Sequence, residues 1–253
     1  MNSVNGTNIP VATYVAAKIP PMPTMPNGST SLRISCAIMA VPERSTQAAD
    51  LVVQLNKQGL AAAMHVDATG AGPWYTAKRC WRSMPGHATH QLMLQDDAIL
   101  CHNFVAGMKA VAAVRPNDPL ALFAADDEHA DYAAMGGHHW MPMLRFGAVA
   151  LLLPRHVIED FLAWQQPLEK HFDESTRGDG ASLRWGLLDD CRLWRYLMYQ
   201  SIRMWATVPS LVDHDVSLPS CIDIVDPLQS RGVFASASNF LGEGNPTDID
   251  WRL

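Results

Sequence analysis

Residues 91–100 read Gln-Leu-Met-Leu-Gln-Asp-Asp-Ala-Ile-Leu, so an apolar run ends in two adjacent aspartates and a second apolar run follows them. Carboxylates are costly to remove from water unless a cation or hydrogen-bond donors compensate them. If the first run is a buried strand, Asp96 and Asp97 lie at its end, where their oxygens suit a divalent cation such as Mg²⁺ or Mn²⁺. The alternative is a solvated turn, or the N-cap of a helix that begins near Ala98, because aspartate is favoured at both places.

Strand and helix patterns alternate around this stretch. Mostly apolar runs at 32–39, 61–66 and 91–95 predict strands, and helical periodicity predicts helices over 46–58 and 74–84. Strand, helix, strand is the repeating unit of a parallel sheet. The sequence therefore predicts an α/β protein with a single domain, in which helices flank a mainly parallel central sheet.

The rest of the chain alternates less regularly. We expect further helices over 104–114, 154–164 and 180–200, and further strands over 120–124, 147–153 and 203–208. Residues 126–145 form a predicted long loop, and such loops in compact domains often bind substrates. We expect the proline-rich residues 1–31 to be a flexible arm, 32–220 to be the domain, and 221–253 to be a tail or lid packed on it.

The composition limits the classes of protein. The net charge of −6 argues against a protein that binds nucleic acid through a global basic field, although it allows a local basic groove. Five cysteines without CxxC spacing suggest neither a disulfide framework nor a zinc ribbon. No apolar stretch reaches the roughly 18–20 residues of a membrane span. Because the N-terminus also lacks a signal-peptide pattern, we expect a cytoplasmic protein.

The order of five short motifs carries a resemblance. The motifs are Ala40-Val41-Pro42-Glu43-Arg44 after the first strand, Gln95-Asp96-Asp97 after the third, Leu153-Pro154-Arg155 after an apolar strand, Asp189-Asp190 on a leucine-rich helix, and Pro209-Ser210-Leu211-Val212-Asp213-His214. In this order they resemble the metal-dependent glycosyltransferases of the GT-A fold, and in particular the small stand-alone enzymes of bacteria and their phages. The resemblance covers about residues 32–217, and the last motif is its most specific element.

The resemblance implies a metal site. The pair Asp96-Asp97 matches the family's DxD-type motif, in which a carboxylate holds a divalent cation against the diphosphate of a sugar nucleotide. Since the spacing departs from a strict Asp-x-Asp, the ligand could be Asp97 alone, with Asp96 facing the ribose or the sugar. His214 matches the distal histidine that often completes the metal site of this fold. The implied cofactor is Mn²⁺ or Mg²⁺.

The resemblance also implies which side chains hold the nucleotide sugar. Pro42, Arg44 and Asp67 occupy places where members of the family hold the nucleotide, and the carboxylate at the place of Asp67 typically faces the base. Lys78 and Arg79 follow a glycine-containing turn and could meet the diphosphate. The alternative is that these two basic side chains lie on a solvated helix face.

An inverting enzyme of this fold needs a general base for the acceptor hydroxyl. We nominate Asp190 for that role, with Asp189 as its neighbour. The competing interpretation is that these aspartates cap a helix, for which aspartate is favoured. Trp140, Arg145 and Trp205 are candidate contacts to the acceptor or the sugar, although tryptophan is more often part of a core.

Together these expectations define a functional hypothesis. The protein would transfer a sugar from a nucleoside-diphosphate sugar, most naturally a UDP-sugar, to an acceptor hydroxyl. The acceptor would be a 5-hydroxymethyl pyrimidine in phage DNA, or alternatively a protein or a polysaccharide. A metal-dependent hydrolase of nucleotide sugars and a nucleotide-binding protein without turnover are the other classes, because a fold alone does not determine activity.

Overall fold

The first half of the chain alternates strands and helices, as its sequence pattern predicts. The computed structural model describes residues 31–124, 138–143, 147–169, 188–218, 236–237 and 239–252. In chain order the elements are β1 (Ile34–Ala40), η1 (Pro42–Arg44), α1 (Ser45–Lys57), β2 (Ala62–Val66), α2 (Pro73–Arg82), β3 (His90–Gln95), β4 (Ala98–Leu100), α3 (Phe104–Val114), β5 (Leu120–Ala121), β6 (Trp140–Met143), β7 (Ala150–Pro154), α5 (Arg155–Gln165), η2 (Gln166–Leu168), α7 (Asp189–Tyr199), β8 (Met204–Thr207), β9 (Val212–His214) and η4 (Pro246–Asp248). Leu32–Leu253 forms one compact unit. The predicted arm, apart from Ser31, and the predicted boundary near residue 220 lie outside the described residues.

Within the described residues the main sheet has seven strands in the order β2-β1-β3-β7-β5-β8-β6. The pairings β1–β2, β1–β3 and β5–β8 are parallel, and β7 and β6 run against their neighbours. Five of the seven strands therefore share one direction. This confirms the predicted α/β class with a mainly parallel central sheet, and the arrangement is consistent with a GT-A-like domain.

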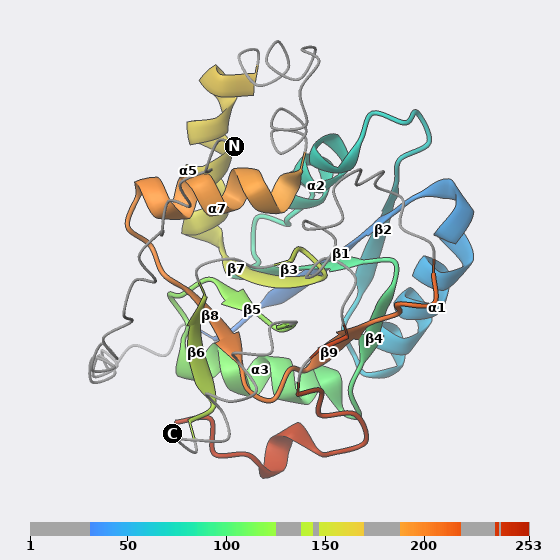
Figure 1. Cartoon of the computed structure of the whole chain (residues 1–253), viewed down its shortest axis with the longest axis vertical. Coiled ribbons are helices and arrows are strands. Elements are labelled where there is room, and N and C mark those ends of the chain that lie inside the picture. The colour runs from blue at the N-terminus through green and yellow to red at the C-terminus, as the bar shows by residue number, and fades with distance from the viewer. Residues whose placement is uncertain are drawn as a thin grey trace, which may run out of the picture. The chain divides into compact units, whose positions relative to one another are not determined.

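Helices cover both faces of the main sheet (Figure 1). The chain moves across the sheet in one direction from β1 to β2 and in the other direction from β2 to β3. Because crossovers between parallel strands are right-handed, the helices of these two connections, α1 and α2, lie on opposite faces. The core on one face joins α2, α5 and α7 through Trp74, Phe161 and Tyr196. Because successive strand residues alternate in direction, Met93 belongs to this core and Leu92 is buried under the opposite face.

A second, two-stranded sheet pairs β4 with β9 in antiparallel register. Ala98 lies opposite His214, and Leu100 lies opposite Val212. The apolar run after the two aspartates is thus a strand, so the alternative of a helix N-cap before Ala98 is wrong. The aspartate pair occupies the turn between β3 and β4, where a buried strand ends.

Several elements differ from the sequence prediction, since β5 ends at Ala121 and β7 begins only at Ala150. β6 lies inside the predicted loop 126–145, and its four residues with a central proline are too short to show a strand period. α7 begins at Asp189, after the extended Leu188 (φ −82°, ψ 133°), and residues 180–187 of the predicted helix lie outside the described residues. Pro154 ends β7 and precedes the first residue of α5. In the described part of the chain, no helix combines the length and apolar character of a membrane span.

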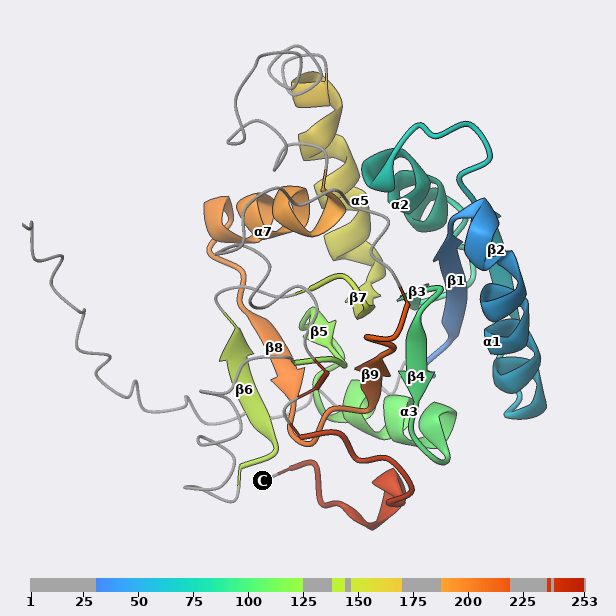
Figure 2. The same cartoon turned by 45° about the vertical axis from the view of Figure 1, so that its right-hand side comes forward.

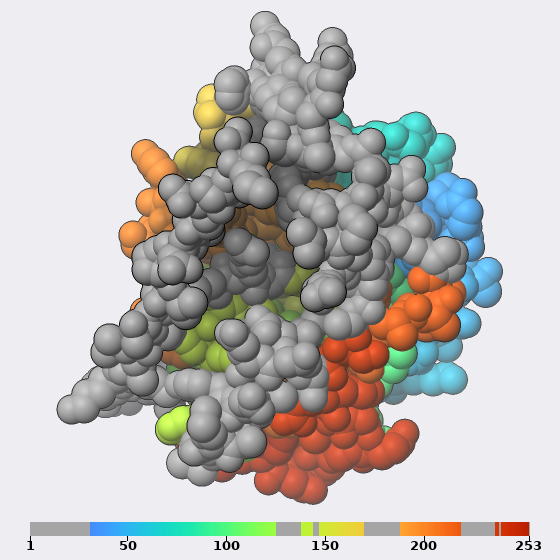
Figure 3. Space-filling model, in the orientation of Figure 1, coloured from blue at the N-terminus to red at the C-terminus, as the bar shows by residue number. Residues whose placement is uncertain are grey.

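The C-terminal residues 239–252 lie against the domain beside α3 in both views (Figure 2). The backbone amide of Ser210 donates to the carbonyl of Asn239 at 2.7 Å. Trp251 is buried, and its indole Nε1 donates to the carbonyl of Pro246 at 2.9 Å. Figure 3 shows the red C-terminal atoms as one continuous surface. This segment is therefore part of the folded domain.

The contact between α3 and η4 leads to a stability prediction. A Cβ built on Gly107 would lie 2.5 Å from Pro246 Cβ and 2.6 Å from Pro246 Cγ, so an alanine there must push η4 away. Alanine favours a helix by roughly 0.5–1 kcal/mol over glycine, but overpacking typically costs more. We expect Gly107→Ala to lower the free energy of unfolding by about 1–2 kcal/mol in urea denaturation.

Gly86→Ala is the matched control, because no atom lies within 4 Å of a Cβ at Gly86. We expect its urea midpoint to stay close to that of the wild type. A Gly107→Ala protein as stable as the wild type would contradict the close packing of η4 on α3.

Candidate functional site

The carboxyl ends of β1 and β3 meet at a topological switch point. The chain leaves β1 through α1 toward β2, whereas it leaves β3 through β4 and α3 toward β5, on the other side of the sheet. In open α/β sheets, ligands bind outside the carboxyl ends of the strands at such a point. Pro42 starts the short turn η1 directly after β1 and brings Arg44 to this place, and Asp96 and Asp97 reach it from β3.

Asp96 ties the two strand ends together. Its Oδ2 accepts a hydrogen bond from the Val41 amide at 2.9 Å, and its Oδ1 accepts one from Arg44 Nη1 at 3.1 Å. Burial raises the pKa of Asp96, and these two donors offset only part of that effect. Val41 was not predicted as a site residue, because a backbone N–H carries no side-chain signal in the sequence.

Asp97 and His214 meet although they lie 117 positions apart in the chain. The pairing of Ala98 with His214 continues one step further, where the Asp215 amide donates to the Asp97 carbonyl at 2.9 Å. This register places His214 Nε2 3.1 Å from Asp97 Oδ2. Arg44 Nη1 donates to the same carboxylate oxygen at 2.5 Å. The two predicted metal ligands are thus in direct contact, and Arg44 is bound to one of them.

The charges of this cluster shift the proton equilibria of its members. Burial alone would raise the pKa of Asp97, but the hydrogen bond and charge of His214, together with those of Arg44, hold that pKa below its usual range. The hydrogen bond to Asp97 raises the pKa of His214 against the effect of burial. Asp97 is therefore ionised at neutral pH, and a cation that binds both side chains must displace the proton that His214 shares.

Asp97 and His214 offer too few ligand atoms to surround a cation by themselves, so a bound substrate would have to complete its coordination. Asp97 Oδ1 and His214 Nδ1 are buried and have no hydrogen-bond partner among the described residues. In the described ranges no group of three or more His, Cys, Asp or Glu side chains could hold a metal. Mg²⁺ is usually held by one or two carboxylates together with water and substrate phosphates, and Mn²⁺ accepts similar ligands. The site therefore fits Mg²⁺ or Mn²⁺ bound with a phosphate-containing ligand, and it does not form a closed protein cage.

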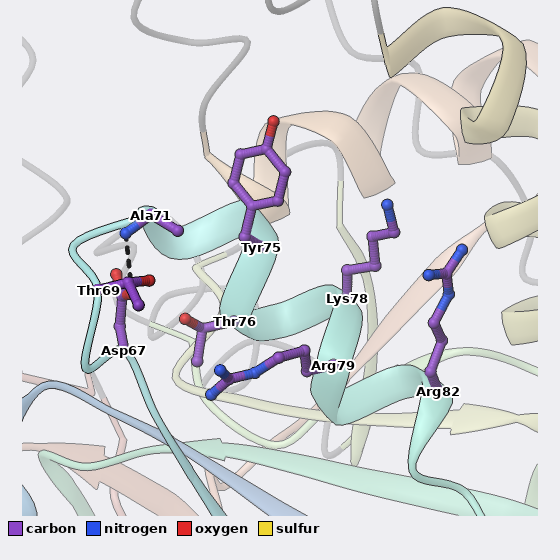
Figure 4. A pocket seen from close by; sticks show the side chains of 8 residues that line it. All are labelled: Asp67, Thr69, Ala71, Tyr75, Thr76, Lys78, Arg79 and Arg82. Atoms are coloured by element: carbon purple, nitrogen blue, oxygen red, sulfur yellow. Dashed lines mark hydrogen bonds between the residues drawn. The ribbon is translucent and has the colours of Figure 1, made fainter.

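A pocket of about 320 Å³ opens between the end of β2 and α2 (Figure 4). Three basic side chains line it, Lys78, Arg79 and Arg82. Lys78 forms an ion pair with Glu169 at 2.5 Å, and Arg79 Nη2 donates to the Val66 carbonyl at 2.6 Å. In Figure 4 the Lys78 and Arg82 side chains extend in the same direction from α2. All three basic side chains thus come from α2, where the sequence predicts contact with a diphosphate, and Arg79 extends toward the side of Asp67.

Asp67 lies at the opposite side of this pocket and shapes the loop before α2. Its Oδ1 accepts from the Ala71 amide at 2.9 Å, and its Oδ2 accepts from the Gly72 amide at 2.8 Å. Gly72 has a φ of 101°, a conformation that other residues rarely adopt. If the base of the nucleotide contacts Asp67, as predicted, it must share the Asp67 carboxylate with the Ala71 and Gly72 amides.

Asp189 and Asp190 form the first turn of α7, next to α2. Leu188 is the N-cap and no side chain caps the helix, so the interpretation of these aspartates as N-caps is wrong. Asp190 Oδ1 accepts from the Cys191 amide at 2.6 Å, whereas Asp189 Oδ2 is buried without a hydrogen-bond partner in the described part of the chain. Burial, followed by the charge of Asp190, raises the pKa of Asp189 from 3.8 to about 8. The predicted role of Asp190 as a base stays a prediction.

Trp140 and Trp205 pack around the guanidinium of Arg115. Arg115 Cζ lies 3.8 Å from the ring centroid of Trp205 and 4.8 Å from that of Trp140. Trp140 Nε1 also donates to the Trp251 carbonyl at 2.5 Å, and both predicted tryptophans are buried. Their surroundings therefore match the core role that is commoner for tryptophan. Arg145 lies outside the described residues.

The buried carboxyl of Asp189 predicts a pH-dependent stability. A carboxyl whose pKa is higher in the folded than in the unfolded state destabilises the fold as pH rises from the unfolded value to the folded value, here from about 4 to about 8. Asparagine does not ionise, so we expect Asp189→Asn to gain stability relative to the wild type as pH rises from about 5 to about 8. Urea midpoints at several pH values measure this difference.

Asp50→Asn, at an exposed position of α1, is the control for loss of one negative charge. Its stability should follow the wild type over the whole pH range. Parallel curves for Asp189→Asn and the wild type would contradict the raised pKa.

Comparisons with known proteins identify distant structural neighbours only. No family model matches the sequence, and no curated protein matches it. Among solved structures, a protein from STIV has a TM-score of 0.42 and 9% identity, covering 71% of this chain and 85% of its own. A mutant of the Drosophila β-1,4-galactosyltransferase 7, in complex with manganese, UDP-Gal and xylobiose, has a TM-score of 0.39 and 10% identity, covering 77% of this chain and 78% of its own.

A further neighbour is a Bacillus anthracis protein described as a glucose-1-phosphate thymidylyltransferase, in complex with sucrose. Its TM-score is 0.37 with 8% identity, and the match covers 70% of this chain and 90% of the other. At TM-scores below 0.5 these likenesses assign neither a family nor an activity to the chain.

Proposed function

We propose that the protein is a metal-dependent glycosyltransferase that uses a nucleoside-diphosphate sugar. The observation that carries this proposal is the contact of His214 Nε2 with Asp97 Oδ2, at 3.1 Å, beside the carboxyl ends of β1 and β3. A carboxylate that suits Mn²⁺ or Mg²⁺ and an imidazole that can ligate a divalent cation meet where α/β sheets bind ligands, although they come from distant parts of the chain. The motif resemblance points to the same two residues.

The chemistry of sugar transfer explains why such a pair is needed. Cleavage of the bond between a sugar and a diphosphate leaves negative charge on the diphosphate, and a bound Mn²⁺ or Mg²⁺ would supply Lewis-acid stabilisation of that charge. Asp97 and His214 would hold the ion. Asp96, anchored by the Val41 amide, keeps the end of β1 beside that of β3. Arg44 lies within reach of the same ligand and would donate hydrogen bonds to a phosphate.

The donor and the acceptor would lie on either side of this cluster. The basic side chains of α2 that line the pocket, with Arg79 as the nominated contact, support a phosphate-containing donor, for which we propose a UDP-sugar. Asp190 would accept the proton of the acceptor hydroxyl. As the acceptor we propose a hydroxymethylated pyrimidine in DNA, with a protein or a polysaccharide as the other candidates.

The proposal predicts that activity depends on Asp97. With UDP- and GDP-sugars, Mn²⁺ and a set of acceptors that includes hydroxymethylated DNA, we expect the wild type to release free nucleotide. Asp97→Asn keeps the shape of the side chain and removes its charge, so nucleotide release should fall by roughly 100-fold or more. Circular dichroism should show the same secondary structure as in the wild type.

Asp50→Asn, on the exposed side of α1, should keep wild-type activity. Release that is as fast without an acceptor as with one would identify a hydrolase of nucleotide sugars instead. Full activity of Asp97→Asn, or of the wild type in EDTA, would contradict the metal site.

A further inference from the structure

Arg44 is ion-paired with both members of the aspartate pair. Its Nη1 donates to Asp96 Oδ1 at 3.1 Å and to Asp97 Oδ2 at 2.5 Å. The arginine is 7% exposed, and the two aspartates are 7% and 8% exposed. Two adjacent carboxylates with so little access to water require a nearby cation. Within this cluster Arg44 is the cation that contacts both carboxylates, and His214 contacts Asp97.

The position of Arg44 conflicts with a divalent cation between Asp97 and His214. Both Arg44 Nη1 and His214 Nε2 point at the same oxygen, Asp97 Oδ2, at 2.5 Å and 3.1 Å. A cation that bridges Asp97 Oδ2 and His214 Nε2 takes up that space, and it would also repel the guanidinium next to it. Coordination through Asp97 Oδ2 and the hydrogen bond from Arg44 therefore exclude each other.

The backbone would keep the aspartates in place without Arg44. Asp96 Oδ2 is still held by the Val41 amide at 2.9 Å. The Asp97 carbonyl accepts from the Asp215 amide at 2.9 Å, in continuation of the β4–β9 pairing. Without Arg44, the Asp96 carboxylate would still be held by the Val41 amide, and the Asp97 carboxylate by His214, so the main role of Arg44 toward them is to balance their charge.

We propose that Arg44 is an exchangeable counter-ion, which leaves Asp97 when a divalent cation binds and then pairs with the diphosphate of the nucleotide. This inference rests on the proposed function, since it needs both a cation and a diphosphate at the site. A bound diphosphate stabilises the state in which Arg44 has left Asp97, and that is the state that accepts the cation. By linkage, the cation strengthens nucleotide binding by the same factor.

The test measures Mn²⁺ binding directly, by calorimetry and by electron paramagnetic resonance of free Mn²⁺, on the full chain. For the wild type we expect weak Mn²⁺ binding that becomes about 10-fold tighter in the presence of UDP. Arg44→Met removes the competing charge, so Mn²⁺ alone should bind about 10-fold tighter than to the wild type, and UDP should tighten the binding by a smaller factor than in the wild type, through direct coordination alone. Arg44→Lys keeps a charge at this position and should retain the dependence on UDP.

Arg252→Met is the matched control, because Arg252 pairs with Asp250 on the surface and its removal changes the net charge equally. It should bind Mn²⁺ as the wild type does. Unchanged or weaker Mn²⁺ binding by Arg44→Met would overturn the exchange while leaving the metal site intact. If Arg44→Met does not fold, the measurement on the wild type still tests the exchange. Equal Mn²⁺ affinity with and without UDP would overturn the proposed exchange of Arg44.

The failure of the proposed function has a different signature. In that case the wild type would bind no Mn²⁺ at all, with or without UDP. The exchange would then be overturned together with the metal site.

Discussion

The carboxylate of Asp97 is the constraint on which the site depends. It is buried at the end of β3, and a buried charge is tolerated only when opposite charges and hydrogen bonds compensate it. Arg44 and His214 provide that compensation, one from the turn after β1 and the other from β9. A single side chain therefore joins the main sheet to the two-stranded sheet.

The topology explains why these residues converge. Both β1 and β3 end at the switch point of the main sheet, and the antiparallel pairing of β4 with β9 carries His214 back to the residue after Asp97. The described C-terminal residues add to this support, because the Ala237 amide donates to Asp213 Oδ1 at 2.6 Å, next to His214. The site thus depends on segments from the whole length of the domain.

The sequence predicted those parts of the structure that have a local signal. The helix over 46–58 and the strand over 91–95 were identified because apolar side chains recur at the helical period in one and form a buried run in the other. The approach of Asp97 to His214 was expected only from the family resemblance that the motif order carries. β6 was missed because its pairing with β8 is non-local. The surroundings of Trp140 and Trp205 were equally hidden, since they depend on the distant Arg115.

A crystal structure with Mn²⁺ and UDP would decide whether Asp97 and His214 hold a cation. We expect an anomalous manganese peak between the Asp97 carboxylate and the His214 imidazole, with the diphosphate completing the coordination and Arg44 moved from Asp97 to a phosphate. A nucleotide bound without manganese at this position, while Arg44 still pairs with Asp97, would contradict this expectation.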